Sequence, residues 1–264
     1  MEMKKVLFQF FISAGLFLSI FWLLSRIDFM RLSKLPEFGR KQADRLSELM
    51  VESILTSHDE IKNDTLKAMV DSIKFPLCAA GGLDPEVIKI HLIKESDVNA
   101  FALPGNHIIV HSALFDFAKN EEEFAGVLSH ELGHIKLDHI QQKLIKEFGH
   151  TLLFTLAGGE GGQEIIKQIL QTISSTSFDR NYEREADQFA VKVLMEMGIS
   201  PERLSDFMLR MADQNRLPSE LVFLSTHPDS RERAAEIIRS KGSFKGSGKK
   251  ILRTPWNSVK ALAH

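Results

Sequence analysis

The chain has a single cysteine, Cys78, among its 264 residues. A lone thiol cannot form an intrachain disulfide framework, and it leaves little room for a zinc site built from thiolates. It does not decide the compartment, because many extracytoplasmic proteins also lack disulfides. The net charge is also small, with a formal value of only −2. This value excludes a strongly basic protein that is steered onto nucleic acid by its overall charge. We therefore expect no nucleic-acid partner, and no internal repeat is visible.

One apolar run, at residues 6–24, is long enough to matter for a membrane. Its length is close to the ~20 residues that a spanning helix needs. Lys4 and Lys5 precede it, but no small-x-small cleavage site follows, so we favour an uncleaved anchor over a removed signal peptide. A buried core helix is disfavoured because every face is apolar. Positive charges flank both sides and do not decide the topology. We expect the rest of the chain on the extracytoplasmic, periplasmic side.

The next part of the chain has the patterns of helices and then of short strands. Apolar residues at helical spacing predict two amphipathic helices within residues 36–75. Alternating and apolar stretches then predict three strands, at residues 88–93, 99–103 and 107–111. Turn signals rich in Gly, Pro and Asn separate these segments.

Helices predominate after residue 120. Asn120 and Glu123 predict a capping box at the start of a helix. Further helices are predicted near residues 164–175, 181–197 and 201–214. The glycine-rich stretch 151–163 is predicted to be a mobile loop, and a flexible linker begins near residue 240, before a tail with Trp256.

These patterns predict three segments and a mixed fold class. The segments are a membrane anchor at residues 1–25, a globular domain at 26–240, and a linker with a C-terminal tail at 241–264. The globular domain is predicted to be α+β, mostly helical with a small β-sheet.

The motif with the most direct chemistry is H-E-x-x-H at residues 130–134. Residues four apart share a face of a helix, so the imidazoles of His130 and His134 can reach one metal ion. Glu131 then lies beside that metal, where a water molecule would be activated. Alone, the motif also fits a helix whose histidines merely face solvent or core. With a further ligand elsewhere in the chain, it indicates a zinc hydrolase, most simply a peptidase.

A second motif, the acidic stretch at residues 183–187, offers that ligand. Such a stretch is usually a solvated helix face, but a catalytic zinc site needs a third protein ligand, and two histidines with one glutamate are a known set. Glu183 is the predicted third ligand. Asp187 lies one turn further on and can accept a hydrogen bond from the outer nitrogen of a ligating histidine. Glu185 points elsewhere and is predicted to be a surface residue.

Four motifs in a fixed order resemble one known family. They are residues 99–105 (NAFALPG), 130–134 (HELGH), 180–187 (RNYEREAD) and 225–228 (STHP), the last followed by Arg233. In these motifs the chain resembles the gluzincin metallopeptidases of the HtpX and CAAX prenyl protease type, metallopeptidase family forty-eight. Because it has one apolar run of spanning length, it resembles a single-membrane-anchor, bacterial-like member rather than a multi-spanning one.

The resemblance implies a zincin-like fold built around the H-E-x-x-H helix, with one Zn²⁺ per chain. It implies that His130, His134 and Glu183 bind the zinc and that Glu131 is the catalytic base, which takes a proton from water and delivers it to the leaving amine. It also implies that His227 approaches the site, where it would either stabilise the oxyanion or block the metal in a resting state. The remaining histidines are assigned to no metal; those considered are His91, His107, His111, His139 and His150.

The resemblance also suggests how a substrate binds. Asn99, Ala100 and Phe101 resemble the edge strand that pairs with substrate main chain in gluzincins, although the same residues would also suit an ordinary core strand. Pairing through the main chain favours unfolded or loosely folded protein segments. We therefore expect a zinc endopeptidase acting on misfolded or membrane-associated proteins. The alternatives are a chaperone-like client-binding protein on the same fold, with low or gated proteolysis, and a metal-free structural protein.

Overall fold

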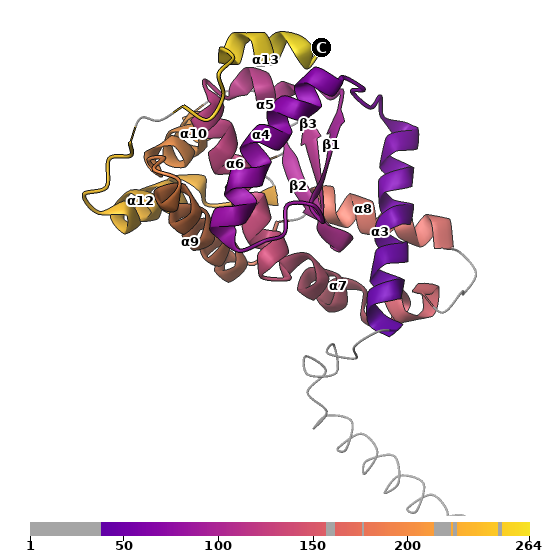
Figure 1. The fold of residues 1–264 in the computed structure, drawn as a ribbon. Coiled ribbons are helices and arrows are strands. Elements are labelled where there is room, and N and C mark those ends of the chain that lie inside the picture. Colours follow the sequence, from indigo (N-terminus) through magenta and orange to yellow (C-terminus); the bar gives the residue numbers. More distant parts are fainter. Residues whose placement is uncertain (1–37, 157–161, 176, 214–222, 224–225, 248–249) are drawn as a thin grey trace, which may run out of the picture. The chain divides into compact units, whose positions relative to one another are not determined.

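The computed structural model describes residues 38–156, 162–175, 177–213, 223, 226–247 and 250–264 (Figure 1). The chain divides into two compact units, Met1–Ala43 and Asp44–His264, and the description below concerns the second. The predicted anchor at residues 6–24 lies outside the described residues. Among the helices that are described, none is both long enough and apolar enough to cross a bilayer.

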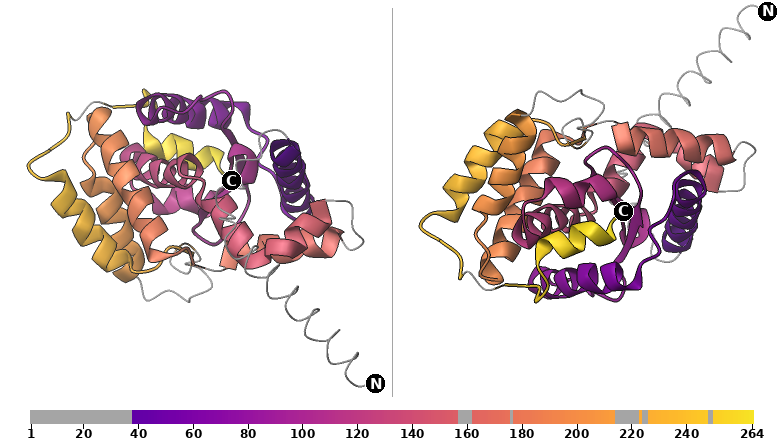
Figure 2. Two further views of the ribbon diagram at one scale, coloured as in Figure 1. Left: turned by 90° about the horizontal axis from the view of Figure 1, so that it is seen from below. Right: turned by 90° about the horizontal axis from the view of Figure 1, so that it is seen from above.

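Helices make up most of the described chain, as predicted. They are α3 (Phe38–Ser57), α4 (Asp64–Gly81), α5 (Ser112–Phe117), α6 (Glu121–Lys136), α7 (His139–Leu156), α8 (Gly162–Ser175), α9 (Arg180–Glu196), α10 (Glu202–Asp213), α12 (Ser230–Lys241) and α13 (Trp256–Leu262). The contacts between them centre on α6, which packs against α4, α9 and α10 (Figure 2).

Three short strands form a small mixed sheet at the predicted positions. They are β1 (Lys89–Ile93), β2 (Ala100–Leu103) and β3 (His107–His111), in the order β1-β3-β2 (Figure 1). β1 runs parallel to β3 and β2 runs antiparallel to it, which makes β2 an edge strand in the described sheet. Gly105 has a φ of 70° in the turn between β2 and β3, and a Cβ there would lie 2.6 Å from Ser47 Oγ. Glycine therefore suits this turn on both conformational and steric grounds.

α6 is the central helix of the domain, and residues 123–135 are buried without a break. Asn120 caps it, because its Oδ1 accepts the N–H of Glu123 at 2.9 Å. The other half of the predicted capping box is displaced by one residue: the carboxylate of Glu123 accepts the N–H of Lys119 at 2.8 Å. The same carboxylate also pairs with Arg210 of α10 at 2.6 Å, which joins the start of α6 to that helix.

α6 crosses α9 at two small residues. A Cβ on Gly133 would lie 3.0 Å from the Cα of Ala186 and 3.1 Å from its carbonyl oxygen. Larger side chains at either position would push the helices apart. The same spacing occurs on both helices: His130 and His134 flank Gly133 as Glu183 and Asp187 flank Ala186. The crossing therefore brings two pairs of polar side chains together.

The predicted mobile loop at 151–163 is wrong for part of its length. Residues 151–156 continue α7, and α8 begins at Gly162, while residues 157–161 lie outside the described chain. The apolar residues before the glycines favour a helix, and only the glycine-rich centre carried the loop signal. The irregular point of α7 is Gly149, whose φ of 37° and ψ of −109° are accessible to glycine.

The described part of the predicted linker and tail packs on the same core. Trp256 opens α13, and its ring centroid lies 6.0 Å from that of Phe115 and 5.5 Å from that of Phe124. A few residues before Trp256, the backbone N–H groups of residues 251 and 252 donate to the carboxylate of Glu121, at 2.7 and 3.0 Å. The tail is thereby tied to the first turn of α6.

Replacing Trp256 with alanine should lower the free energy of unfolding by about 3–5 kcal/mol. The change removes a buried indole and its hydrogen bond from Nε1 to the carbonyl of Ala118. Urea unfolding of the purified protein measures this, with the exposed Arg253→Ala as the control, expected within about 0.5 kcal/mol of the parent. A loss below about 1 kcal/mol for Trp256→Ala would show that the tail contributes little to the core.

Candidate metal centre

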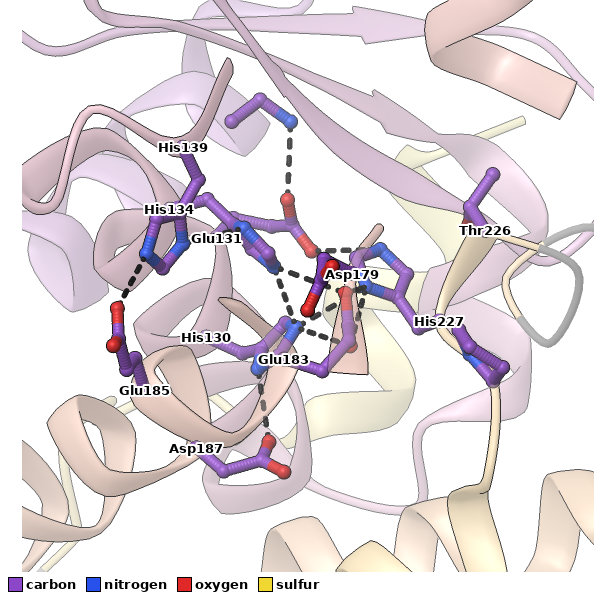
Figure 3. A network of polar contacts seen from close by, with 12 residues as sticks. His130, Glu131, His134, His139, Asp179, Glu183, Glu185, Asp187, Thr226 and His227 are labelled. Atoms are coloured by element: carbon purple, nitrogen blue, oxygen red, sulfur yellow. Dashed lines mark hydrogen bonds and ion pairs between the residues drawn. The ribbon is translucent and has the colours of Figure 1, made fainter. Parts of the chain in front are cut away.

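Three histidines and a glutamate converge where α6 crosses α9 (Figure 3). Ligand atoms of His130, His134, Glu183 and His227 all lie within 4.8 Å of one another, and all four residues are buried. The Nε2 atoms of His130 and His134 are 3.0 Å apart. The Glu183 carboxylate lies 3.5 Å from the first and 3.4 Å from the second. The structure thus brings together the three predicted ligands and His227, which was expected to approach the site.

An ion-paired layer lies behind these side chains. Asp187 Oδ1 is 3.0 Å from the outer nitrogen, Nδ1, of His130. Arg233 of α12 donates to both oxygens of Asp187, at 2.7 Å each, and also pairs with Glu183. Although burial would raise the pKa of Asp187, Arg233 lowers it to about 2, so this carboxylate is ionised. In the sequence, Arg233 was recognisable only as part of the family pattern, and it had no predicted role.

Glu131, which lies on α6 with the two histidines, faces the sheet. Its Oε2 accepts the N–H of Ala102 in β2 at 3.0 Å, and its Oε1 lies 3.4 Å from Nε2 of His227. Both Oε1 of Glu131 and Nε2 of His227 are buried and have no hydrogen-bond partner in the described structure. Such orphaned polar atoms are rare in folded proteins, so a pair of them suits a site that receives another polar group.

The family model described as Peptidase family M48 matches residues 60–240, a range that contains every residue of this centre. The chain belongs to peptidase family M48. It is therefore a zinc-dependent metallopeptidase, which confirms the enzyme class and the cofactor that the motifs predicted.

Several relatives within this family can be compared with the chain. It is 28% identical over 211 residues to the Beta-barrel assembly-enhancing protease of Yersinia pestis, covering 74% of this chain and 41% of that protein. It is 30% identical over 159 residues to Metalloprotease LoiP of Escherichia coli, covering 58% and 62% respectively. It is 27% identical over 165 residues to Mitochondrial metalloendopeptidase OMA1 of Schizosaccharomyces pombe, covering 61% and 49%. The chain spans about half the length of the curated relatives it matches.

The donor set and its charges fit a zinc ion. Two imidazole nitrogens and a carboxylate oxygen are a known catalytic set. Burial would raise the pKa of Glu183, but its interactions with His227 and Arg233 and its hydrogen bonds to His130 and His134 hold it well below its usual range. Burial lowers the pKa of His134 well below its usual value, which leaves the ring neutral, as a ligand must be. At His130 burial also lowers the pKa, but hydrogen bonds to Asp187 and Glu183 outweigh it and raise the pKa to about 9. These carboxylates favour a positive charge between them.

The residues predicted to bind substrate lie beside this centre. Ala100 and Phe101 open β2, and Asn99 precedes them with 1% of its surface exposed. The side-chain oxygen of Asn99 has no hydrogen-bond partner among the described residues. Just before it, the carbonyl of Val98 accepts the N–H of Phe223 at 3.3 Å. The chain that leads to His227 therefore touches the start of the predicted substrate strand.

His139 had no predicted role, but it lies next to the centre. Its Nδ1 is 3.1 Å from Nδ1 of His134, its Nε2 is 3.1 Å from Oε2 of Glu185, and its ring stacks on Tyr182 with centroids 4.5 Å apart. A residue five positions after His134 would not share its face on a continuous helix. The contact arises because α6 ends and Asp138, with a φ of 58°, redirects the chain. No helical spacing rule would have found it.

Three other histidines that were predicted to bind no metal lie in other contacts. His91 and His107 pair with each other at 2.8 Å on the sheet, and His111 lies 3.1 Å from Asp97. None of them belongs to the metal-binding group found among the described residues. The side chain of His150 lies outside the described structure.

Proposed function

We propose that the chain is a zinc endopeptidase that cuts misfolded or membrane-associated proteins. In this proposal His130, His134 and Glu183 hold the zinc and Glu131 is the base. The observation that carries it is the orphaned Oε1 of Glu131, which is buried beside three converging donors. Relatives named Beta-barrel assembly-enhancing protease support a substrate class connected with the assembly of β-barrel proteins.

The chemistry follows from the directions of these side chains. When bound, zinc lowers the pKa of a water molecule towards ~7 and polarises the scissile carbonyl. Glu131 takes the proton of the attacking water at Oε1 and delivers it to the leaving amine. The N–H of Ala102 holds the other oxygen and so orients the carboxylate. Burial raises the pKa of Glu131, which makes it a better proton acceptor.

The proposed substrate is an extended protein segment that lies along β2. Its main chain would pair with the strand through backbone hydrogen bonds, which read few side chains. The orphaned Oδ1 of Asn99 supports this mode, because a substrate N–H would give it the partner that it lacks in the described structure. Ala100 and Phe101 would supply the strand itself.

His227 supports a gated site. Its Nδ1 lies 3.0 and 3.1 Å from the Glu183 oxygens and 3.2 Å from Nε2 of His130. The ring is thus a fourth protein donor, and four protein donors are typical of closed zinc sites, whereas catalytic sites keep one position open. We propose that this conformation is a resting state and that His227 moves away for hydrolysis.

The closed site also supports the alternative, a chaperone-like protein that holds clients at β2 with little proteolysis. The two functions differ in their need for Glu131. A Glu131→Gln variant that restored growth to a loss-of-function strain would favour client binding, because binding does not require the base.

Replacing Glu131 with glutamine should lower casein cleavage by at least about 10²–10⁴-fold while zinc stays bound. Glu183→Ala should instead strip or weaken the zinc, because it removes a ligand. Elemental analysis and a casein assay measure both, and Glu122→Gln on the same helix is the control. Undiminished cleavage by Glu131→Gln would remove it as the base, and full zinc content in Glu183→Ala would remove it as a ligand.

Replacing His227 with alanine should raise casein cleavage per bound zinc and weaken zinc binding. The change opens the position that the ring occupies and removes one of four donors. Chelator competition measures the second effect. A fall in cleavage of about 10²–10³-fold at unchanged zinc affinity would instead assign His227 to the oxyanion.

We also propose that residues 6–24 anchor the chain, with the catalytic domain on the extracytoplasmic, periplasmic side. The apolar run after Lys4 and Lys5 supports this. Alkaline phosphatase fused after residue 264 should be active, since it requires an oxidising compartment. Removing residues 1–25 should release the protein from membranes. An inactive fusion at normal expression would place the domain in the cytoplasm.

A further inference from the structure

We propose that His139 is a positioning residue for His134, and that it extends the hydrogen bonding of this zinc ligand to the surface carboxylate of Glu185. The inference rests on the proposed ligand set, in which His134 binds zinc. The chain of contacts has two links of 3.1 Å each, from His134 Nδ1 to His139 Nδ1 and from His139 Nε2 to Glu185 Oε2 (Figure 3).

The protons along this chain follow from the direction of His134. Its Nε2 points at the donor cluster, 3.0 Å from Nε2 of His130 and 3.4 Å from Glu183. With Nε2 as the ligand atom, Nδ1 carries the proton and donates it to Nδ1 of His139. His139 then carries its own proton on Nε2 and donates to Glu185, an acceptor when ionised. Glu185 therefore selects the tautomer of His139 that can accept from His134.

The two histidine ligands have different outer partners. His130 contacts a carboxylate directly, and Arg233 holds that carboxylate, Asp187, in a buried ion pair. His134 contacts a neutral ring, and the carboxylate beyond it belongs to a side chain that is 54% exposed. The orientation of His134, unlike that of His130, therefore depends on a residue that solvent reaches.

Packing offers the competing explanation for His139. Its ring lies within 14° of parallel to that of Tyr182, with centroids 4.5 Å apart, and it is fully buried. The two explanations make opposite demands on a substitute. Packing requires a flat ring and no particular polar atom, whereas positioning requires an acceptor near the place of Nδ1 and no ring.

Two variants of the full-length protein separate these demands. His139→Phe keeps a ring for Tyr182 and removes the acceptor, and we expect zinc to bind about 10–100-fold more weakly. His139→Asn loses the ring but keeps an oxygen near Nδ1, and we expect zinc affinity within about threefold of the parent. Chelator competition gives the affinities. The visible spectrum of the Co²⁺-loaded protein should shift for His139→Phe and stay unchanged for His139→Asn. The reverse order of the two variants would overturn the inference.

Substitutions at Glu185 test the exposed end of this chain of hydrogen bonds without changing a core residue. Glu185→Ala should weaken zinc binding by severalfold, and Glu185→Gln should restore it because its amide oxygen still accepts a hydrogen bond. Glu196→Ala, an exposed glutamate on the same helix, is the matched control. If the variants at 139 fail to fold, unchanged zinc affinity in Glu185→Ala still overturns the inference.

A His134→Ala variant separates failure of this inference from failure of the proposed function. Unchanged zinc affinity in His134→Ala would remove the ligand and, with it, both proposals. A large loss there, with none in His139→Phe, would overturn only the role of His139.

Discussion

The close crossing of α6 and α9 at Gly133 and Ala186 is the constraint on which the metal centre depends. Neither helix alone carries a complete donor set, since α6 has the histidines and α9 has the carboxylates. With a Cβ on Gly133 only 3.0 Å from Ala186 Cα, the backbones are as close as side chains allow. This distance puts Glu183 within reach of both histidines. A bulkier residue at the crossing would push the two helices apart. The donors would then lie too far from one another, although none of the donor residues had been changed.

Such a centre gathers charged and polar groups where water is excluded, which is unfavourable unless each group has a partner. Arg233 meets this need for Glu183 and Asp187, and the two carboxylates in turn favour a positive charge at His130. The arrangement of these groups therefore favours the binding of a cation. Among the described residues, Glu131 Oε1, His227 Nε2 and Asn99 Oδ1 are buried without a hydrogen-bond partner, and the proposed water and substrate interactions would involve these atoms.

The edge strand β2, Glu131 and His227 form one connected unit. β2 holds Glu131 through the N–H of Ala102, and Glu131 lies beside His227. The carbonyl of Phe223 accepts the N–H of His227 at 2.8 Å, and the N–H of Phe223 donates to the carbonyl of Val98, two residues before β2. These two hydrogen bonds connect His227 to the part of the chain that enters β2.

Local spacing was sufficient to predict most elements and the residues that converge at the candidate metal centre. The positions of the three strands, of α6 and of the two histidines four residues apart all follow from periodicity within one element. The loop expected at 151–163 was partly wrong because glycine content outweighed the helical residues before it. The contact of Asp187 with His130 was predictable in the same way, but the contacts of three other residues were not. Arg233, His139 and Trp256 act across gaps in the sequence, and their contacts exist because separate helices pack together and the chain turns at Asp138. Such contacts depend on how the elements pack in space, which no short-range pattern encodes.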